Sequence, residues 1–381
     1  MKLVIAGGGT GGHLFPGIAV AEEFLARDPG NEVLFVGTER GIEARAVPAA
    51  GYRLELISAA GIRGKHGLTQ FAGIAKMIYG YAQSRKVLKA FRPDLVLGVG
   101  GYASLPMVLA ARGMRIPRFI HEQNAIPGQT NQLLSRFADK VFITLEESAK
   151  YFPKDSTLLT GNPLRRQILD MVESLNSSHP PLDNGGEELP PFQGEGRGGD
   201  GGFKLFIFGG SQGAHAINMA MVEALPLLKE SRDKLVITHQ TGEKDCEEVA
   251  GAYRAAGIDA RVTPFISDMA SEYSKADLVI CRAGATTIAE VTACGKTCLF
   301  IPFPHAVDDH QRRNAEALLK KDACFMLLEQ ELTGKRLAET ITELAADSGK
   351  VKRTAELAFG MARLDAARII VDQMFERQVT P

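Results

Sequence analysis

The fold of this chain is decided by the stretch Leu3-Val4-Ile5-Ala6-Gly7-Gly8-Gly9-Thr10-Gly11-Gly12-His13, in which a short apolar run ends in glycines. A helical spacing of apolar residues follows, from Ile18 to Leu25. The pattern predicts a buried strand, a glycine turn and the start of a helix. At such a turn the backbone N–H groups are free, the helix dipole is positive, and no Cβ blocks a phosphate. The stretch therefore predicts an anion-binding loop.

The second half of the chain repeats this pattern. Its version is Leu205-Phe206-Ile207-Phe208-Gly209-Gly210-Ser211-Gln212-Gly213, followed by apolar residues at helical spacing from Ile217 to Leu225. Two such loops predict an α/β protein of two Rossmann-like domains, each with a doubly wound parallel sheet, facing each other across a cleft. This arrangement suits an enzyme that handles two phosphorylated substrates.

Strands and helices are expected to alternate in both halves, which is typical of parallel sheets. Expected strands are 3–6, 33–36, 54–57, 95–99, 118–121, 140–143 and 158–159, then 205–208, 235–240, 260–263, 278–281, 297–301 and 324–327. We divide the chain into a first domain (1–163), a linker (164–202) with a flexible Gly/Pro-rich insertion (174–202), a second domain (203–360) and a C-terminal segment (361–381). The stretch 351–377 is expected to be helical and its end to pack back on the first domain.

Composition narrows the class of protein. Hydrophobic residues make up 45% of the 381 residues, enough for two cores, and the net charge of −1 gives no reason to expect nucleic acid as a partner. The five cysteines have no C-x-x-C pair, which indicates reduced thiols in a cytoplasmic protein. No Asp-x-Asp pair is present, so we expect neither a metal nor another cofactor, and stabilisation of phosphate charge by helix dipoles and Arg.

Polar residues after three strands of the first half are the candidate site there. His13 stands where a helix begins and suits a general base, although it would also serve as a cap or an anion ligand. Gly98–Ser104 follows a strand at the usual ligand edge, or is only a tight turn. His121-Glu122-Gln123-Asn124 puts polar side chains directly after a buried strand, which packing alone explains poorly.

In the second half the strongest element is Cys281–Glu290. A strand ends, Gly284 turns the chain, and a helix begins near Thr286, so that Glu290 is placed to chelate a ribose diol while the helix N-terminus attracts phosphate. The plainer interpretation is a helix start with an exposed Glu. His310-Gln311-Arg312-Arg313-Asn314 offers imidazole and amide groups to sugar hydroxyls, or is an ordinary helix start.

A basic and apolar segment, 63–92, contains no acidic residue. Its Lys and Arg residues alternate with apolar and aromatic ones, which suits an anionic membrane surface. The alternative is that its apolar side is core and its charges are only solvated. No apolar run in the chain has the length of a membrane span.

Several of these motifs together resemble the MurG family of bacterial glycosyltransferases. They are Gly8–His13, Gly100-Gly101-Tyr102, His121–Asn124, Gly161-Asn162-Pro163-Leu164-Arg165, Gly209–Ala214 and Arg282–Glu290, and they follow the family's order over nearly the whole chain. The resemblance implies a GT-B fold and an inverting, metal-independent transfer of GlcNAc from UDP-GlcNAc to lipid I, which is undecaprenyl-pyrophosphoryl-MurNAc-pentapeptide. It also implies a peripheral enzyme on the cytoplasmic face of the inner membrane, in contact with other cell-wall synthesis proteins.

The resemblance also assigns roles to residues. His13 would be the general base and Glu290 would hold the uridine ribose. Donor-binding residues would be Thr10, Gly11, Gly12, His13, Asn124, Arg165, Ser211, Gln212, Ile266, Ala285, Thr286, Glu290, His310 and Gln311. Acceptor and pyrophosphate residues would be Gly9, Thr10, Gly100, Gly101, Tyr102, His121, Glu122 and Gln123. The sequence departs from the family in the long 174–202 insertion and at Ala283 and Thr286.

Three other functions stay open at this point. Gly7, Gly9 and Gly12 formally match the dinucleotide pattern G-x-G-x-x-G, and Glu39 stands near the acidic position of a nicotinamide oxidoreductase. A UDP-sugar epimerase of the same fold would need no lipid acceptor and no basic surface. A non-catalytic nucleotide-sugar or membrane-binding module would leave His13 without a purpose.

Overall fold

The computed structural model describes residues 1–59, 68–177, 202–210 and 212–379; within these ranges the side chains of 68–74, 176–177, 307 and 378–379 are not described. The chain divides into two compact units. Unit 1 comprises residues 1–165 and 363–381, and unit 2 comprises residues 166–362. The chain therefore passes from one unit to the other at Arg165/Arg166 and returns at Ala362/Arg363.

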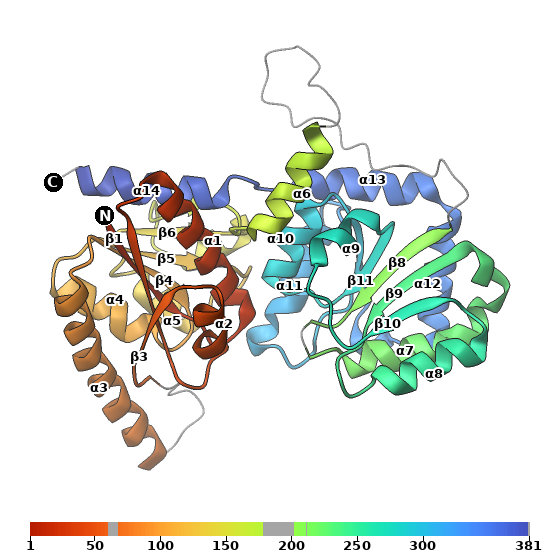
Figure 1. Ribbon diagram of the computed structural model, residues 1–381, viewed down its shortest axis with the longest axis horizontal. Coiled ribbons are helices and arrows are strands. Elements are labelled where there is room, and N and C mark those ends of the chain that lie inside the picture. The colour runs from red at the N-terminus through yellow and green to blue at the C-terminus, as the bar shows by residue number, and fades with distance from the viewer. Residues whose placement is uncertain (60–67, 178–201, 211, 380–381) are drawn as a thin grey trace. The chain divides into compact units, whose positions relative to one another are not determined.

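Unit 1 is built on a parallel sheet of order β3-β2-β1-β4-β5-β6-β7 (Figure 1). Its strands are β1 Lys2–Gly7, β2 Glu32–Gly37, β3 Arg53–Leu56, β4 Leu95–Gly100, β5 Arg118–Glu122, β6 Lys140–Ile143 and β7 Thr157–Leu159. Its helices are α1 Gly11–Arg27, α2 Glu43–Ala49, α3 Leu68–Phe91, α4 Ser104–Gly113, α5 Gln129–Leu134, the 3-10 helix η1 Glu146–Tyr151 and α14 Ala366–Val379.

Alternate residues of each buried strand of unit 1 face opposite helix layers. Leu3 and Ile5 of β1 pack with α1 and α14, whereas Val4 and Ala6 pack with α3 and α4. All four are completely buried, which explains why β1 is a continuous apolar run rather than an alternating one. The sheet is thus covered on both faces.

Unit 2 has the same architecture, with a parallel sheet of order β10-β9-β8-β11-β12-β13 (Figure 1). Its strands are β8 Phe203–Phe208, β9 Leu235–Gln240, β10 Ala260–Thr263, β11 Leu278–Cys281, β12 Thr297–Phe300 and β13 Phe325–Met326. Its helices are α6 Arg166–Ser177, α7 His215–Ala224, η2 Leu225–Lys234, α8 Cys246–Ala256, α9 Met269–Lys275, α10 Ala285–Ala293, η3 Val307–Asp309, α11 His310–Leu319, η4 Glu329–Glu331, α12 Gly334–Ala346 and α13 Ser348–Phe359.

The two faces of the unit 2 sheet have different coverings. Leu205 and Ile207 of β8 pack in a cluster with α7, α8 and α12. Phe206 and Phe208, on the other face, meet the ring of Tyr273 from α9 at centroid distances of 5.7 and 6.0 Å. Both sheets are therefore doubly wound, and the predicted fold class is confirmed.

Two sequence expectations about helices differ from the structure. The stretch 351–377 is not one helix, because α13 ends at Phe359 and α14 begins at Ala366. Gly360 caps α13, and the intervening residues carry the chain from unit 2 back to unit 1. Residues 166–177 of the expected linker form α6, whose Ile168 and Val172 are buried within unit 2. The rest of the expected insertion, 178–201, lies outside the described residues.

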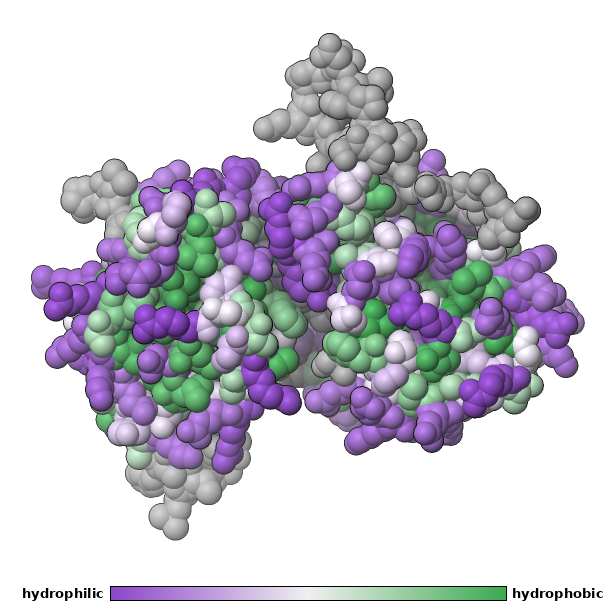
Figure 2. Space-filling view, in the orientation of Figure 1, coloured by the Kyte–Doolittle hydropathy of each residue, from purple (hydrophilic) through white to green (hydrophobic). Residues whose placement is uncertain are grey.

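The visible surface of both units mixes residue types. In Figure 2 hydrophilic residues cover the outer rims, and hydrophobic residues appear as separate patches among them. This is the ordinary surface of a protein in contact with water, where isolated apolar side chains are normal. No helix within the described part of the chain combines the length and apolar character that a membrane span requires.

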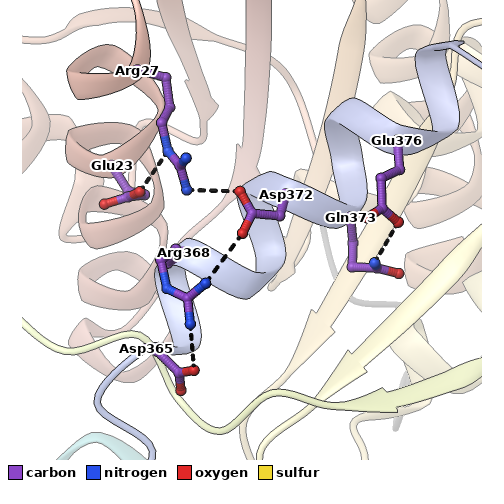
Figure 3. A network of polar contacts seen from close by, with 7 residues as sticks. All are labelled: Glu23, Arg27, Asp365, Arg368, Asp372, Gln373 and Glu376. Atoms are coloured by element: carbon purple, nitrogen blue, oxygen red, sulfur yellow. Dashed lines mark hydrogen bonds and ion pairs between the residues drawn. The ribbon is translucent and has the colours of Figure 1, made fainter.

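Helix α14 is held on α1 by packing and by a polar network. Ile370, Val371 and Met374 are completely buried against the core of unit 1, and the ring of Phe375 meets that of Phe24 edge-on at 5.5 Å. Along the rim, Arg27 donates to Asp372 at 2.7 Å, and Asp372 also pairs with Arg368 (Figure 3). The C-terminal segment is thus part of the core of unit 1.

Candidate functional site

The site of unit 1 lies where the strand order reverses, between β1 and β4. In doubly wound sheets ligands bind at this switch point, outside the carboxyl ends of the strands. The loop after β1 and the loop after β4 touch there through their backbones, since the Gly8 N–H donates to the Gly100 carbonyl at 3.3 Å. A Cβ on Gly100 would lie 2.9 Å from Nδ1 of His13, so that only glycine leaves room for the imidazole. The structure therefore brings Gly8–His13 and Gly100–Tyr102 together.

A chain of hydrogen bonds fixes which ring nitrogen of the neutral His13 carries the proton. Nε2 of Gln123 donates to the carbonyl of Val99 at 2.9 Å, which fixes the orientation of the Gln123 side-chain amide. Its Oε1 therefore faces Nδ1 of His13, 2.8 Å away, and Nδ1 must be the donor. In the neutral ring, Nε2 of His13 is then the unprotonated nitrogen, which is able to accept a proton.

His121 closes the other end of this chain. Its Nε2 donates to the carbonyl of Gly161 at 3.2 Å, and its Nδ1 accepts from Nε2 of Gln123 at 3.0 Å. Burial lowers the pKa of His121 to about 4, because a charged ring would lose its hydration, and the neighbouring His13 adds to the shift. His121 is thus a neutral, buried ring that holds Gln123, not a group exposed to a ligand.

Glu122 organises the loop after β5. Only 1% exposed, it accepts from the backbone N–H of Asn124 at 2.9 Å and from Nδ2 of Asn131 at 2.9 Å. Its second oxygen also accepts from the N–H of Gly128 at 3.2 Å. Glu122 therefore holds Asn124 in place from inside the loop. By contrast, the Tyr102 side chain in the loop after β4 is 57% exposed and open to a ligand.

The site of unit 2 also lies at a switch point, between β8 and β11. The glycine loop after β8 leads into α7, and Gly213 N donates to the Gly210 carbonyl at 2.9 Å. A Cβ on Gly213 would collide with the carbonyl of Thr241, the residue after β9, so this position requires glycine. Gln212 is exposed beside this loop, and Ser211 lies outside the described residues.

Gln240, the last residue of β9, joins two parts of this site. Its Nε2 donates to the Gly210 carbonyl at 2.9 Å, and its Oε1 accepts from the N–H of Ile266 at 3.0 Å. Gln240 is 2% exposed and therefore acts as an internal brace between the glycine loop and the segment that precedes α9.

Helix α10 presents the remaining donor candidates. It begins at Ala285 after Gly284, and the buried hydroxyl oxygen of Thr286 has no hydrogen-bond partner within the described chain. A buried polar atom without a partner is costly, and a ligand at the helix N-terminus would satisfy it. Glu290, one turn further on, is 2% exposed and accepts from the Tyr273 hydroxyl at 3.3 Å. The plainer interpretation of Glu290 as an exposed helix residue is therefore wrong.

Other candidates lie at the ends of elements around these two sites. His310 begins α11, and Oε1 of Gln311 accepts from the N–H of Phe303 at 3.0 Å. Arg165, the last residue of the first segment of unit 1, lies 5.5 Å from the ring centroid of Phe15. Expected donor-binding residues thus fall in both units: Thr10–His13, Asn124 and Arg165 in unit 1, and Gln212, Ile266, Ala285, Thr286, Glu290, His310 and Gln311 in unit 2.

Two residues of these sites were missed by sequence reasoning. Gln240 follows a buried strand and precedes Thr241-Gly242, the same signal that singled out His121–Asn124. Glu43 lies at the start of α2, and its Oε2 accepts from the Gly9 N–H at 2.7 Å. No local pattern predicts that contact, because it joins residues 34 positions apart.

The basic segment 63–92 is only partly described. Helix α3 buries Ser84, Leu88 and Phe91 in unit 1, whereas Ile78 and Tyr79 are 67% and 59% exposed. The described apolar residues of α3 are therefore divided between the core and the surface. The alternative that the whole apolar side is core does not hold for Ile78 and Tyr79, and contact with a membrane stays a prediction.

Two doubly wound units with glycine loops at their switch points are the architecture of the GT-B fold. The chain belongs to glycosyltransferase family 28 and, within it, to the MurG enzymes. The family's N-terminal domain matches residues 3–143 and its C-terminal domain matches residues 204–369.

Individual relatives agree with this placement. The chain is 69% identical to the UDP-N-acetylglucosamine--N-acetylmuramyl-(pentapeptide) pyrophosphoryl-undecaprenol N-acetylglucosamine transferase of Pelobacter propionicus, over 98% of this chain and 99% of that enzyme. Among solved structures, Acinetobacter baumannii MurG is 32% identical, with a TM-score of 0.76 over 98% of this chain and 99% of that one. A UDP-GlcNAc 2-epimerase from Neisseria meningitidis, 14% identical with a TM-score of 0.65 over 99% and 100% of the two chains, shares the fold alone.

Proposed function

We propose that this enzyme transfers GlcNAc from UDP-GlcNAc to the MurNAc 4-hydroxyl of lipid I, which yields lipid II for peptidoglycan synthesis. The observation that carries this proposal is the 69% identity to a transferase of that name, over nearly the full length of both chains. The epimerase alternative rests on fold alone and is not favoured.

The donor is proposed to bind on unit 2. Its diphosphate would lie against the glycine loop and the N-terminus of α7, where free amides and the helix dipole stabilise the negative charge that develops on departing UDP. Glu290 would accept hydrogen bonds from the ribose hydroxyls, with Ile266, Ala285 and Thr286 beside the nucleoside. Gln212, His310 and Gln311 would contact the sugar and diphosphate, as would Ser211, whose structure is not described.

The acceptor is proposed to bind on unit 1. The loops at 10–12 and 100–102 would hold its pyrophosphate, and Asn124 and Arg165 would contact the reacting sugars. His13 is proposed as the general base. Its unprotonated Nε2 takes the proton of the attacking hydroxyl, the oxygen forms the new bond to the anomeric carbon, and UDP leaves from the opposite face with the bonding electron pair. Inversion at the anomeric carbon follows from this single displacement.

The lipid acceptor implies work at a membrane surface. We propose that the exposed part of α3, with Ile78, Tyr79 and nearby lysines, touches the anionic cytoplasmic face of the inner membrane. Peripheral attachment of this kind would leave the enzyme accessible to other cell-wall synthesis proteins.

The test is transfer of labelled GlcNAc from UDP-GlcNAc to a short-chain lipid I analogue in EDTA. A β-linked disaccharide lipid would support the reaction, the donor and the expected metal independence together. Release of UDP without a lipid product would instead favour an epimerase or hydrolase. Product formed only after a divalent cation is restored would refute metal independence and leave the transfer intact.

A further inference from the structure

The first glycine loop already holds an anion, the carboxylate of Glu43. Oε2 of Glu43 accepts from the Gly9 N–H at 2.7 Å. Oε1 accepts from the N–H of Thr38 at 2.9 Å and from its hydroxyl at 3.0 Å. The side chain is 2% exposed, although Glu43 belongs to a short helix at the edge of the unit.

Glycines make the walls of this carboxylate pocket. A Cβ on Gly8, Gly37 or Gly41 would collide with atoms of the Glu43 side chain. These glycines come from the loop after β1, from the end of β2 and from the β2–α2 connection. Two stretches of chain, the loop after β1 and the end of β2 with its following connection, therefore leave the same space open, and this carboxylate fills it.

This carboxylate pocket lies where a glycine loop usually binds phosphate. In a dinucleotide-binding domain the glycine loop after the first strand presents its amides to a pyrophosphate, and an acidic residue after the second strand binds a ribose. Here Glu43, from the helix after the second strand, turns onto the loop itself and accepts from the Gly9 amide. Its charge also repels a phosphate from this point.

We propose that Glu43 is a positioning residue that keeps phosphate away from Gly9 and holds the start of α1 for His13. The backbone path from Gly9 to His13 is short. The carbonyl of Thr10, the residue after Gly9, accepts from the N–H groups of His13 and Leu14 at 3.3 and 3.2 Å. A shift of Gly9 therefore moves the imidazole relative to Gln123. This differs from the expected role of Gly9 as a pyrophosphate residue: the acceptor pyrophosphate is then held by amides beyond Gly9, and Gly9 itself contributes only through Glu43.

This inference rests on the proposed role of His13, and its test uses the full-length enzyme with Glu43→Gln. The neutral side chain keeps one acceptor oxygen, which the two donors of Thr38 hold, and therefore turns its NH₂ group toward the single donor of Gly9. The loop thus loses a hydrogen bond and the pocket loses its charge. We expect kcat with the lipid I analogue to fall about tenfold or more, while KM for UDP-GlcNAc changes by less than about twofold. A wild-type enzyme that forms no lipid product would contradict the proposed function instead, before any variant is compared.

Inhibition by inorganic pyrophosphate is a second measurement. The proposal predicts stronger inhibition in the variant, whereas damage to the site would weaken it. With the carboxylate gone, pyrophosphate should inhibit Glu43→Gln about threefold more strongly than wild type, competing with the lipid. A merely structural role would lower both turnover and pyrophosphate affinity. Unchanged kcat, or reduced turnover with unchanged or weaker pyrophosphate inhibition, would overturn the proposal.

Two further variants complete the design. Glu39→Gln removes an exposed carboxylate from the same β2–α2 connection and should behave as wild type in both measurements. Thr38→Val keeps the Glu43 charge and removes only the hydroxyl donor, so it should lower kcat by about twofold to fivefold without stronger pyrophosphate inhibition. If Glu43→Gln does not fold, wild-type turnover in Thr38→Val would refute the positioning role.

Discussion

At the scale of single residues, the amide of Gln123 decides which nitrogen of His13 carries the proton. We predict that Gln123→Met, which keeps the volume and loses the amide, lowers kcat by about tenfold to a hundredfold. The reason is that His13 loses the acceptor that orients its ring and selects the tautomer with a basic Nε2. Steady-state kinetics with both substrates measures the effect, and KM for UDP-GlcNAc should change little.

A double-mutant cycle separates this role from general damage. If Gln123 acts only through His13, then Gln123→Met should cost little further activity in a His13→Ala background. The exposed Gln129→Met serves as the matched control and should retain full activity. Additive losses in the double variant would show that Gln123 contributes independently of His13.

The second prediction at this scale concerns Glu290, whose carboxylate is buried beside the hydroxyl of Tyr273. Glu290→Gln should weaken UDP binding by about tenfold to a hundredfold, because a buried, charged acceptor for the ribose diol is replaced by a neutral amide. Tyr273→Phe should weaken it less, since the carboxylate stays. Calorimetric titration with UDP measures both, and Glu248→Gln, an exposed change on α8, is the control. Unaltered UDP affinity in Glu290→Gln would refute the ribose assignment.

At the scale of elements, the end of β9 braces the glycine loop of the proposed donor site. Gln240→Met should lower UDP affinity by about tenfold, because the Gly210 carbonyl and the Ile266 N–H both lose their partner. Gln240→Glu keeps an acceptor for Ile266 but sets a buried, charged oxygen against the Gly210 carbonyl, so its loss of UDP affinity should be at least as large. Equal UDP affinity in all three proteins would show that the glycine loop holds its shape without the brace.

How much of the molecule is predictable from sequence also differs by element. The buried strands are continuous apolar runs that end in glycine or polar residues, so β1, β4, β8 and β11 are found almost to the residue. The loops at the switch points follow from the same runs. The break between α13 and α14 was missed because helical periodicity is good on both sides and does not show where the chain changes unit.

Within the sites, predictability depends on distance along the chain. His13, Gln123 and Glu290 stand directly beside strand or loop signals, and local pattern therefore singles them out. Local pattern does not single out the groups that orient them. The Val99 carbonyl that holds Gln123 comes from a neighbouring strand, and Glu43 accepts from Gly9, 34 positions earlier in the chain. The sequence thus predicts which side chains are present at the site. The tautomer of His13 and the hydrogen bonds that hold these side chains are known only from the structure.

At the scale of the whole molecule, the last helix belongs to the first unit. Ile370 of α14 is completely buried in the core beside α1, whereas Asp372 lies on the rim with 37% of its side chain exposed. Truncating a buried Ile leaves a cavity and costs about 2–5 kcal/mol, while a partly exposed ion pair contributes about 1 kcal/mol or less. We therefore predict that Ile370→Ala destabilises unit 1 strongly and that Asp372→Asn does so only slightly.

Hydrogen exchange followed by mass spectrometry locates this effect, because peptides from β1 and β8 report on unit 1 and unit 2 separately. In Ile370→Ala, peptides that contain β1 should exchange faster than in wild type, and peptides that contain β8 should not change. Leu344→Ala, an equally deep truncation in α12 of unit 2, should give the reverse pattern. Equal acceleration of both strands in either variant would mean that the units unfold together, and the C-terminal helix would then stabilise the molecule as a whole rather than complete the core of unit 1.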